Sequence, residues 1–229
     1  CEDGRVAVCV LLADGDVGPH AADVGAGHPH LRRVLVQTAN RGGARLQHQG
    51  GHPNARLLGA LVDVLGGGTT GMAVGEDHTI RHTAVIAVAG DKVTDDIRKG
   101  LGVMRDQAEQ LKRQFGVALA GEADSDEKIE IPGIGGRDEK TIGRDALAQI
   151  IQPRLEEILE IAAMEIKRSG YGRHLGVGAV LTGGGSLVPY TDELAAEVLG
   201  MEARVGRPMG LSGGLVEEVS DPKFSTGVG

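Results

Sequence analysis

The sequence predicts an α/β protein in which a mixed sheet is flanked by helices. Short apolar runs alternate with segments whose apolar residues recur at helical spacing. Aromatic residues make up only 2% of the 229 residues, so Val, Ile, Leu and Ala must build the core. Many of the 38 glycines directly follow apolar runs, as expected where strands end in tight loops.

The first predicted elements form a sheet. Residues 61–65 are an apolar run that predicts a buried strand. A turn at 75–77 separates residues 72–74 from 79–88, where side chains alternate between two faces, and this pattern predicts a β-hairpin. The chain therefore enters the sheet as a meander.

Two helices are predicted next. In residues 93–101 the apolar side chains stand at i, i+4 and i+8, and Asp91 is placed to cap the first turn. Residues 106–115 repeat this spacing, and Gly116 marks the expected C-terminal end.

The second half of the chain continues the alternation. Residues 121–146 are polar and rich in glycine, except that 128–131 alternate like an edge strand. The longest helix is predicted over 144–168, with its apolar stripe packed on the sheet. Three elements follow: a strand at 177–181, a helix at 191–199 and a last strand at 201–205.

Charge and cysteine content exclude several classes of protein. The net charge is −8, and no basic stripe with interleaved aromatic residues is present, so we predict no binding to nucleic acid. Two cysteines, Cys1 and Cys9, cannot make a disulfide framework, which indicates a reducing compartment. The apolar run at 6–13 is too short to cross a membrane.

Residues 1–60 differ in composition from the rest. They contain no Lys and no Ile, but five of the eight histidines. A GC-rich gene read in a shifted frame gives this composition, so we leave residues 1–60 unassigned, as out-of-frame or disordered sequence. No helix or hairpin pattern holds these histidines at ligand spacing, and we predict no metal there. Because the chain begins with Cys and stops at Gly229, we expect it to be a fragment.

Two of the predicted strands run directly into glycine-rich loops, at 66–70 and at 182–186. A loop without β-carbons lets successive backbone N–H groups point at phosphate oxygens. The hydroxyls of Thr69 and Thr70 add further donors in the first loop. Either loop alone can also be a simple tight turn, but the two together favour nucleotide binding.

The order of the motifs resembles the second half of an actin-like ATPase domain. It runs from a strand through Asp-x-x-Gly-Gly-Gly-Thr-Thr, a hairpin, Ala-Gly-Asp, Glu-x-x-Lys and a long helix to Thr-Gly-Gly-Gly-Ser. Within that superfamily, residues 80–97 and 133–137 are similar to the bacterial cell-division family FtsA. The resemblance covers residues 61–229 and implies one lobe of a ribonuclease H-like fold, a partial domain with a helical and edge-strand insertion at about 91–175.

The resemblance implies a role for each loop. The β- and γ-phosphates of ATP would be held by Gly66, Gly67, Gly68, Thr69 and Thr70. The adenosine loop would consist of Gly183, Gly184, Gly185 and Ser186. Glu109 and Lys112 would touch the ribose or the adenine edge, although such a pair three residues apart on a helix is more often a solvated surface pair.

Asp63 would hold Mg²⁺ through water or orient the attacking water; alternatively it caps the glycine loop. The sequence departs from the family pattern here, because Val64 and Leu65 separate Asp63 from the first glycine where the family has one residue. One extra strand residue turns a side chain to the other face. Gly71 also stands where the family usually has Asp. We therefore expect at most weak ATPase activity, and only together with a first lobe.

The resemblance implies an ATP-binding division protein that forms actin-like filaments and tethers the FtsZ ring to the cytoplasmic membrane. The family attaches to the membrane through a C-terminal amphipathic helix, so the resemblance implies that the full-length protein lies at the cytoplasmic face of the membrane. We do not find this helix in the present sequence. Two alternatives stay open. One is a sugar or acid kinase of the same superfamily, for which we can name no general base, and the other is a scaffold for pilus or filament assembly.

Overall fold

The structure is a computed structural model that describes residues 6–9, 61–65, 67–76, 79–133, 138–172, 175–208 and 219–225. Its main sheet contains, among these residues, six strands. They are β1 (Val6–Cys9), β2 (Leu61–Leu65), β3 (Thr70–Glu76), β4 (Thr79–Ile86), β7 (Leu175–Thr182) and β8 (Ala203–Val205). The mixed sheet and the predicted hairpin β3–β4 are confirmed.

The direction of the central strands decides where the loops meet. β2 is antiparallel to β3 but parallel to β7, with Val64 opposite Thr182, and β7 is parallel to β8. Parallel neighbours end at the same edge of a sheet. The two glycine-rich loops therefore leave the sheet side by side, although more than a hundred residues separate them in the sequence.

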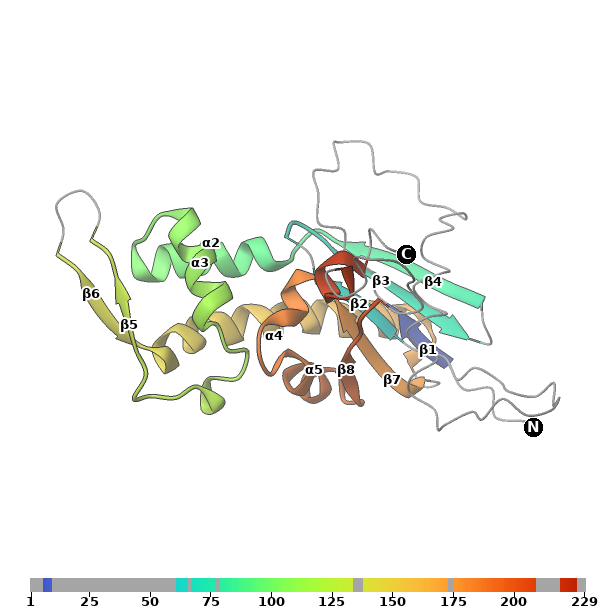
Figure 1. Cartoon of the computed structure of the whole chain (residues 1–229). Helices are drawn as coiled ribbons and strands as arrows, with labels where there is room; N and C mark the ends of the chain where they lie inside the picture. Colours follow the sequence, from blue (N-terminus) through green and yellow to red (C-terminus); the bar gives the residue numbers. More distant parts are fainter. Residues whose placement is uncertain are drawn as a thin grey trace.

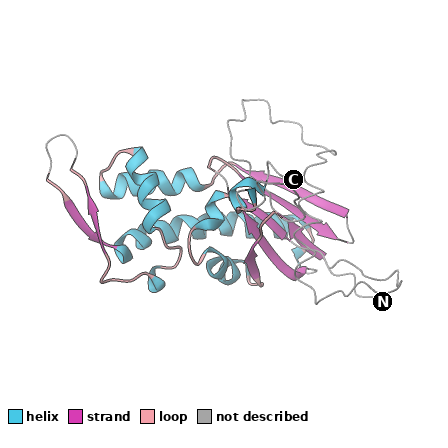
Figure 2. Ribbon diagram, viewed as in Figure 1, coloured by secondary structure: helices cyan, strands magenta, loops and turns pink. Residues whose placement is uncertain are grey.

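The helices lie between the sheet and a small two-stranded hairpin (Figures 1 and 2). α2 (Gly90–Leu101) and α3 (Arg105–Phe115) follow β4, and α4 (Arg144–Ser169) runs from the hairpin back to the sheet. α5 (Thr191–Leu199) contacts both α4 and β8. The hairpin consists of β5 (Lys128–Ile131) and β6 (Lys140–Gly143).

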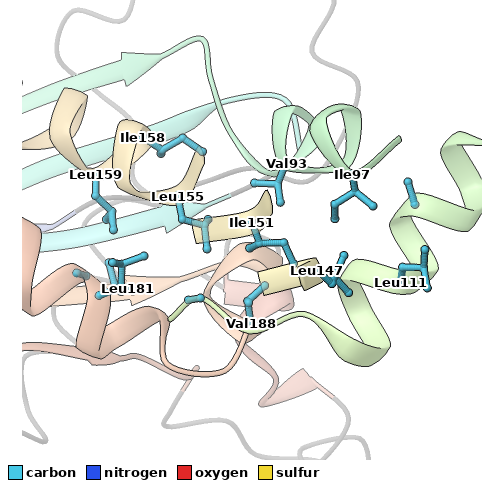
Figure 3. Close-up of a cluster of buried hydrophobic side chains, with 14 of the residues drawn as sticks. Val93, Ile97, Leu111, Leu147, Ile151, Leu155, Ile158, Leu159, Leu181 and Val188 are labelled. Carbon is cyan, nitrogen blue, oxygen red and sulfur yellow. The ribbon is translucent and has the colours of Figure 1, made fainter. Parts of the chain in front are cut away.

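One face of α4 organises the core (Figure 3). Leu147, Ile151, Leu155 and Ile158 recur at helical spacing and are at most 3% exposed. They belong to one cluster with buried residues of α2, α3 and β7. The predicted apolar stripe is thus confirmed, and it fixes α2 and α3 relative to the edge of the sheet where the two loops emerge.

The structure corrects the predicted start of the first helix, which begins three residues earlier than the predicted range 93–101. α2 begins at Gly90 after Ala89 as N-cap, and Asp91 lies inside the first turn and does not cap it. The backbone N–H of Asp91 donates instead to the carbonyl of Gly67, at 2.7 Å. Gly116 does follow α3, but with φ −60; glycine is required because an added Cβ would lie 2.2 Å from the carbonyl oxygen of Lys112.

Two strands were not expected. β6 lies in the polar stretch 121–146, where the sequence predicts a strand only at 128–131, and it pairs with β5 in antiparallel register. β1 lies within the unassigned residues 1–60, antiparallel to β3 and parallel to β7, as β2 is. The rest of residues 1–60 lies outside the described residues. Their assignment and the proposed division of the chain into lobe and insertion stay predictions.

Candidate functional site

A cavity of about 550 Å³ opens where the two glycine-rich loops leave the sheet. This volume is in the range of small-molecule sites. Its walls come from the first loop, the start of α2, one face of α3, the second loop and the 3₁₀ turn Pro222–Phe224. Among the lining residues are Gly67, Gly90, Asp91, Arg105, Glu109, Lys112, Arg113, Gly184, Gly185, Leu187 and Lys223.

The first loop is anchored by two hydrogen bonds. The Asp91 N–H holds the carbonyl of Gly67, and the buried Thr70 hydroxyl donates to the carbonyl of Val88, at 2.6 Å. Gly68 is exposed, and an added Cβ would meet nothing within 4 Å. Gly68 and Thr69 are left exposed beside Gly67, which lines the cavity, while the hydroxyl of Thr70 holds the loop in place.

The second loop is built in the same way. Gly183 has φ 86, a conformation that favours glycine, and its N–H donates to the carbonyl of Pro222. The buried Ser186 hydroxyl donates back to the Gly183 carbonyl, at 2.8 Å. Gly184 and Gly185 between them line the cavity. A flat ring or a phosphate can approach the backbone at these two residues because neither carries a side chain.

The pair Glu109 and Lys112 reaches the cavity wall from α3. Lys112 Nζ lies 2.6 Å from Glu109 Oε2, 2.8 Å from the Thr94 hydroxyl and 3.2 Å from the carbonyl of Gly90. The Thr94 hydroxyl lies 2.5 Å from Glu109 Oε2, and Arg113 Nε lies 2.8 Å from Glu109 Oε1. Glu109 and Lys112 thus belong to a partly buried hydrogen-bond network, and their side chains are only 30% and 12% exposed, unlike those of an ordinary surface ion pair.

The network sets the charge of Glu109. Burial alone would raise the pKa of this carboxyl group, but hydrogen bonds from Lys112 and Thr94 and the charge of Lys112 outweigh it and lower the pKa to about 2. Glu109 therefore presents a permanent negative charge beside two cations, Lys112 and Arg113.

Further cations surround the mouth of the cavity. Arg105 at the start of α3 pairs with Asp91 at 3.1 Å and with Asp95 at 3.4 Å. Lys223 comes from the other wall, 3.4 Å from Asp221 and 4.9 Å from the centre of the Phe224 ring. Glycine backbone and cationic side chains in the walls of one cavity form a surface that suits a phosphate ester.

Comparison with known proteins decides the family. The sequence model of the family described as "Cell division protein FtsA" matches residues 60–229, which is most of the chain. The chain belongs to the FtsA family. It is 41% identical over 172 residues to the cell division protein FtsA of Pseudomonas aeruginosa, covering 75% of this chain and 41% of that protein. It is 36% identical over 181 residues to FtsA of Escherichia coli K12, covering 76% and 43%.

The predicted actin-like fold is confirmed by solved structures. MreB5 of Spiroplasma citri bound to AMPPNP matches with a TM-score of 0.55 and 19% identity, over 73% of this chain and 50% of that one. The ADP-bound form of the same protein matches with a TM-score of 0.56 over 85% of this chain and 56% of that one. The chain therefore has the fold of one part of an actin-like ATPase and spans about two fifths of the length of its FtsA relatives.

Five of the residues that the FtsA resemblance implies line one cavity: Gly67, Glu109, Lys112, Gly184 and Gly185. Asp63 lies on β2 opposite Met72 and Leu181, and its side chain is outside the described part, as is Gly66. Their roles stay predictions.

Sequence reasoning missed Thr94, Arg105 and Lys223. Thr94 stands four residues after Gly90 in an amphipathic helix, and that spacing points its hydroxyl back at the first turn. Arg105 begins a helix that was predicted one residue too late. No local signal could have found Lys223, because it belongs to a separate turn that reaches the cavity from the far end of the chain.

The described residues contain no cluster of three or more His, Cys, Asp and Glu side chains that could hold a metal ion. Hard cations that accompany nucleotides take most of their ligands from phosphate and water, so such a cluster is not required. In the part of the chain that the structure describes, we also find no helix long and apolar enough to cross a membrane.

Proposed function

We propose that this chain is the nucleotide-gripping lobe of an FtsA-type cell-division protein, and that its ligand is ATP with Mg²⁺. The observation that carries the proposal is the cavity between the ends of the parallel strands β2 and β7. Ligands of open α/β sheets bind beyond the carboxyl ends of the strands, which is where this cavity opens.

The two walls suit the two parts of a nucleotide. The first loop lines the cavity with Gly67, and its exposed neighbours Gly68 and Thr69 would offer backbone N–H groups to phosphate oxygens. Gly184 and Gly185 in the second loop leave room for the adenosine. Mg²⁺ would sit on the phosphates, and Asp63 is the carboxylate that we propose to reach it through water. The chain's own residues thus bind and orient ATP, and any hydrolysis would be weak without the first lobe.

Titration calorimetry with ATP and Mg²⁺ tests the binding. The informative variant is Gly184→Val, because its side chain would fill the floor of the cavity. The matched control is Gly121→Val, since Gly121 lies in the 3₁₀ turn Ala120–Glu122 and a Cβ there meets nothing within 4 Å. We expect Gly184→Val to bind at least about tenfold more weakly, and Gly121→Val to bind like the unmodified chain. Equal binding by all three proteins, or no binding by the unmodified chain, would contradict the proposal.

We further propose that the protein assembles into actin-like filaments and links the FtsZ ring to the cytoplasmic face of the membrane. Membership of the FtsA family and the likeness to MreB5 support this role. Co-sedimentation of the chain with polymerised FtsZ, with and without ATP, tests it; the same spin with lipid vesicles alone measures direct attachment to membrane. Sedimentation with neither FtsZ nor another copy of the chain would argue for a different partner.

A further inference from the structure

Thr94 lies at the centre of the network beside the cavity. It is 1% exposed and stands in the second turn of α2, facing α3. Its single hydroxyl proton has its shortest partner in Glu109 Oε2, at 2.5 Å, while its oxygen accepts from Lys112 Nζ at 2.8 Å. One hydroxyl therefore orders both members of the Glu-x-x-Lys pair.

Lys112 has no donor left for a ligand in this arrangement. An ammonium group carries three protons. The three contacts of Lys112 are Glu109 Oε2, the Thr94 hydroxyl and the carbonyl of Gly90. Its side chain is 12% exposed, so water does not compete strongly for these protons. Lys112 acts within the protein, in contrast to the direct ligand contact that the family resemblance implies.

Glu109, unlike Lys112, can still form a further hydrogen bond. Each carboxylate oxygen accepts about two hydrogen bonds. Oε2 already accepts from Thr94 and Lys112, whereas Oε1 accepts only from Arg113 among the described residues. Glu109 is 30% exposed and lines the cavity. Oε1 is therefore the acceptor that the network leaves for a hydroxyl group of the ligand.

We propose that Thr94 is a positioning residue, which together with Lys112 holds Glu109 so that Oε1 accepts a ribose hydroxyl of the bound nucleotide. This inference rests on the proposed function, since it requires a ribose in the cavity. Thr94 itself does not touch the ligand; it fixes the rotamer of the residue that does.

The same network is linked to the first glycine-rich loop through the peptide unit between Gly90 and Asp91. The carbonyl of Gly90 accepts from Lys112, and the N–H of the same peptide, that of Asp91, donates to Gly67. The orientation of this peptide plane thus depends on Lys112 at one end and on the first glycine-rich loop at the other. Ribose recognition and phosphate recognition share a rigid link.

The test compares the affinities of ATP and 2′,3′-dideoxy-ATP, both with Mg²⁺, in the 229-residue chain. The unmodified chain should prefer ATP by at least about tenfold, because a site that hydrogen-bonds a hydroxyl rejects an analogue that lacks it. Thr94→Val should reduce this preference to about threefold or less. Thr94→Ser, which restores the hydroxyl, should keep the preference, as should the control Thr83→Val on the exposed face of β4.

The outcomes separate this inference from the proposed function. A preference for ATP that Thr94→Val leaves intact, or lowers no more than Thr83→Val does, would overturn the role of Thr94. If the unmodified chain binds neither nucleotide, the proposed function fails. A carbon-detected NMR titration of the Glu109 carboxyl group without nucleotide gives a separate test: Thr94→Val should raise the pKa of Glu109 and Thr94→Ser should not, and an unchanged pKa would contradict the inference.

Discussion

At Glu109, burial and hydrogen bonding act in opposite directions on the same proton. Burial favours the neutral acid, while contacts with Lys112, Thr94 and Arg113 favour the carboxylate and win. The pKa of Glu109 falls from the ordinary 4.5 to about 2. A carboxyl group whose pKa is lower in the folded chain stabilises the fold at every pH above its unfolded pKa. This stabilisation is lost as the pH falls through the folded value.

The first prediction follows from this linkage. Glu109→Gln should lower the free energy of unfolding near neutral pH, because Lys112 and Arg113 lose their anionic partner. The difference from the unmodified chain should shrink between about pH 4.5 and about pH 2, where Glu109 itself becomes neutral. Urea unfolding at a series of pH values measures it. The exposed Glu122, changed to Gln, is the control; a difference at Glu109 that does not vary with pH would contradict the prediction.

Single residues also mark the limit of what the sequence could predict about the site. The glycine loops could be predicted because runs of glycine directly after an apolar strand indicate a tight loop. The three partners of the Lys112 ammonium group could not be predicted, since they come from α2 and α3 and depend on how these helices pack. Asp91 is a plausible cap by residue type, because Asp often caps helices, but the N-cap is Ala89, two residues earlier, and Asp91 lies inside the first turn.

At the scale of elements, α4 connects the β5–β6 hairpin and the helices α2 and α3 to the main sheet. Its buried stripe touches the cluster that includes Val93 on α2 and Leu181 on β7. Strong helical periodicity made this helix predictable to within one residue at its C-terminal end. β6 was missed for the opposite reason: its burial is partial and its sequence polar, so no alternation distinguishes it from a loop until β5 pairs with it.

The second prediction concerns that stripe. Ile151 is 0% exposed, and Ile151→Ala should cost about 2–5 kcal/mol of unfolding free energy, because it leaves a cavity between α4 and its neighbours. Met164→Ala on the same helix should cost less than about 1 kcal/mol, since Met164 is 54% exposed. Urea or thermal unfolding compares the two. Similar losses at both positions would mean that α4 does not pack as described.

At the scale of the whole molecule, the sheet topology creates the site. The first glycine loop precedes the hairpin and the second follows α4, yet the parallel pairing of β2 and β7 brings them to one edge. Lys223 then reaches the same cavity from the turn after β8. The glycine-rich loops could suggest nucleotide binding from the sequence, but only the strand order could show that segments so distant in sequence line one cavity.

The third prediction follows from this convergence. A ligand that bridges both loops and α3 binds the folded chain and not the unfolded one, so ATP with Mg²⁺ should raise the unfolding free energy by about 2.7 kcal/mol at a concentration one hundred times its dissociation constant. Inorganic triphosphate should stabilise less, because it lacks the ribose and base that we propose to contact Glu109, Gly184 and Gly185 at the cavity wall. Thermal unfolding measures both, with Gly184→Val as the variant that should lose the response to ATP but retain that to triphosphate. Equal stabilisation by ATP and triphosphate would place the ligand on the first loop alone and would leave the wall formed by the second loop without a role in binding.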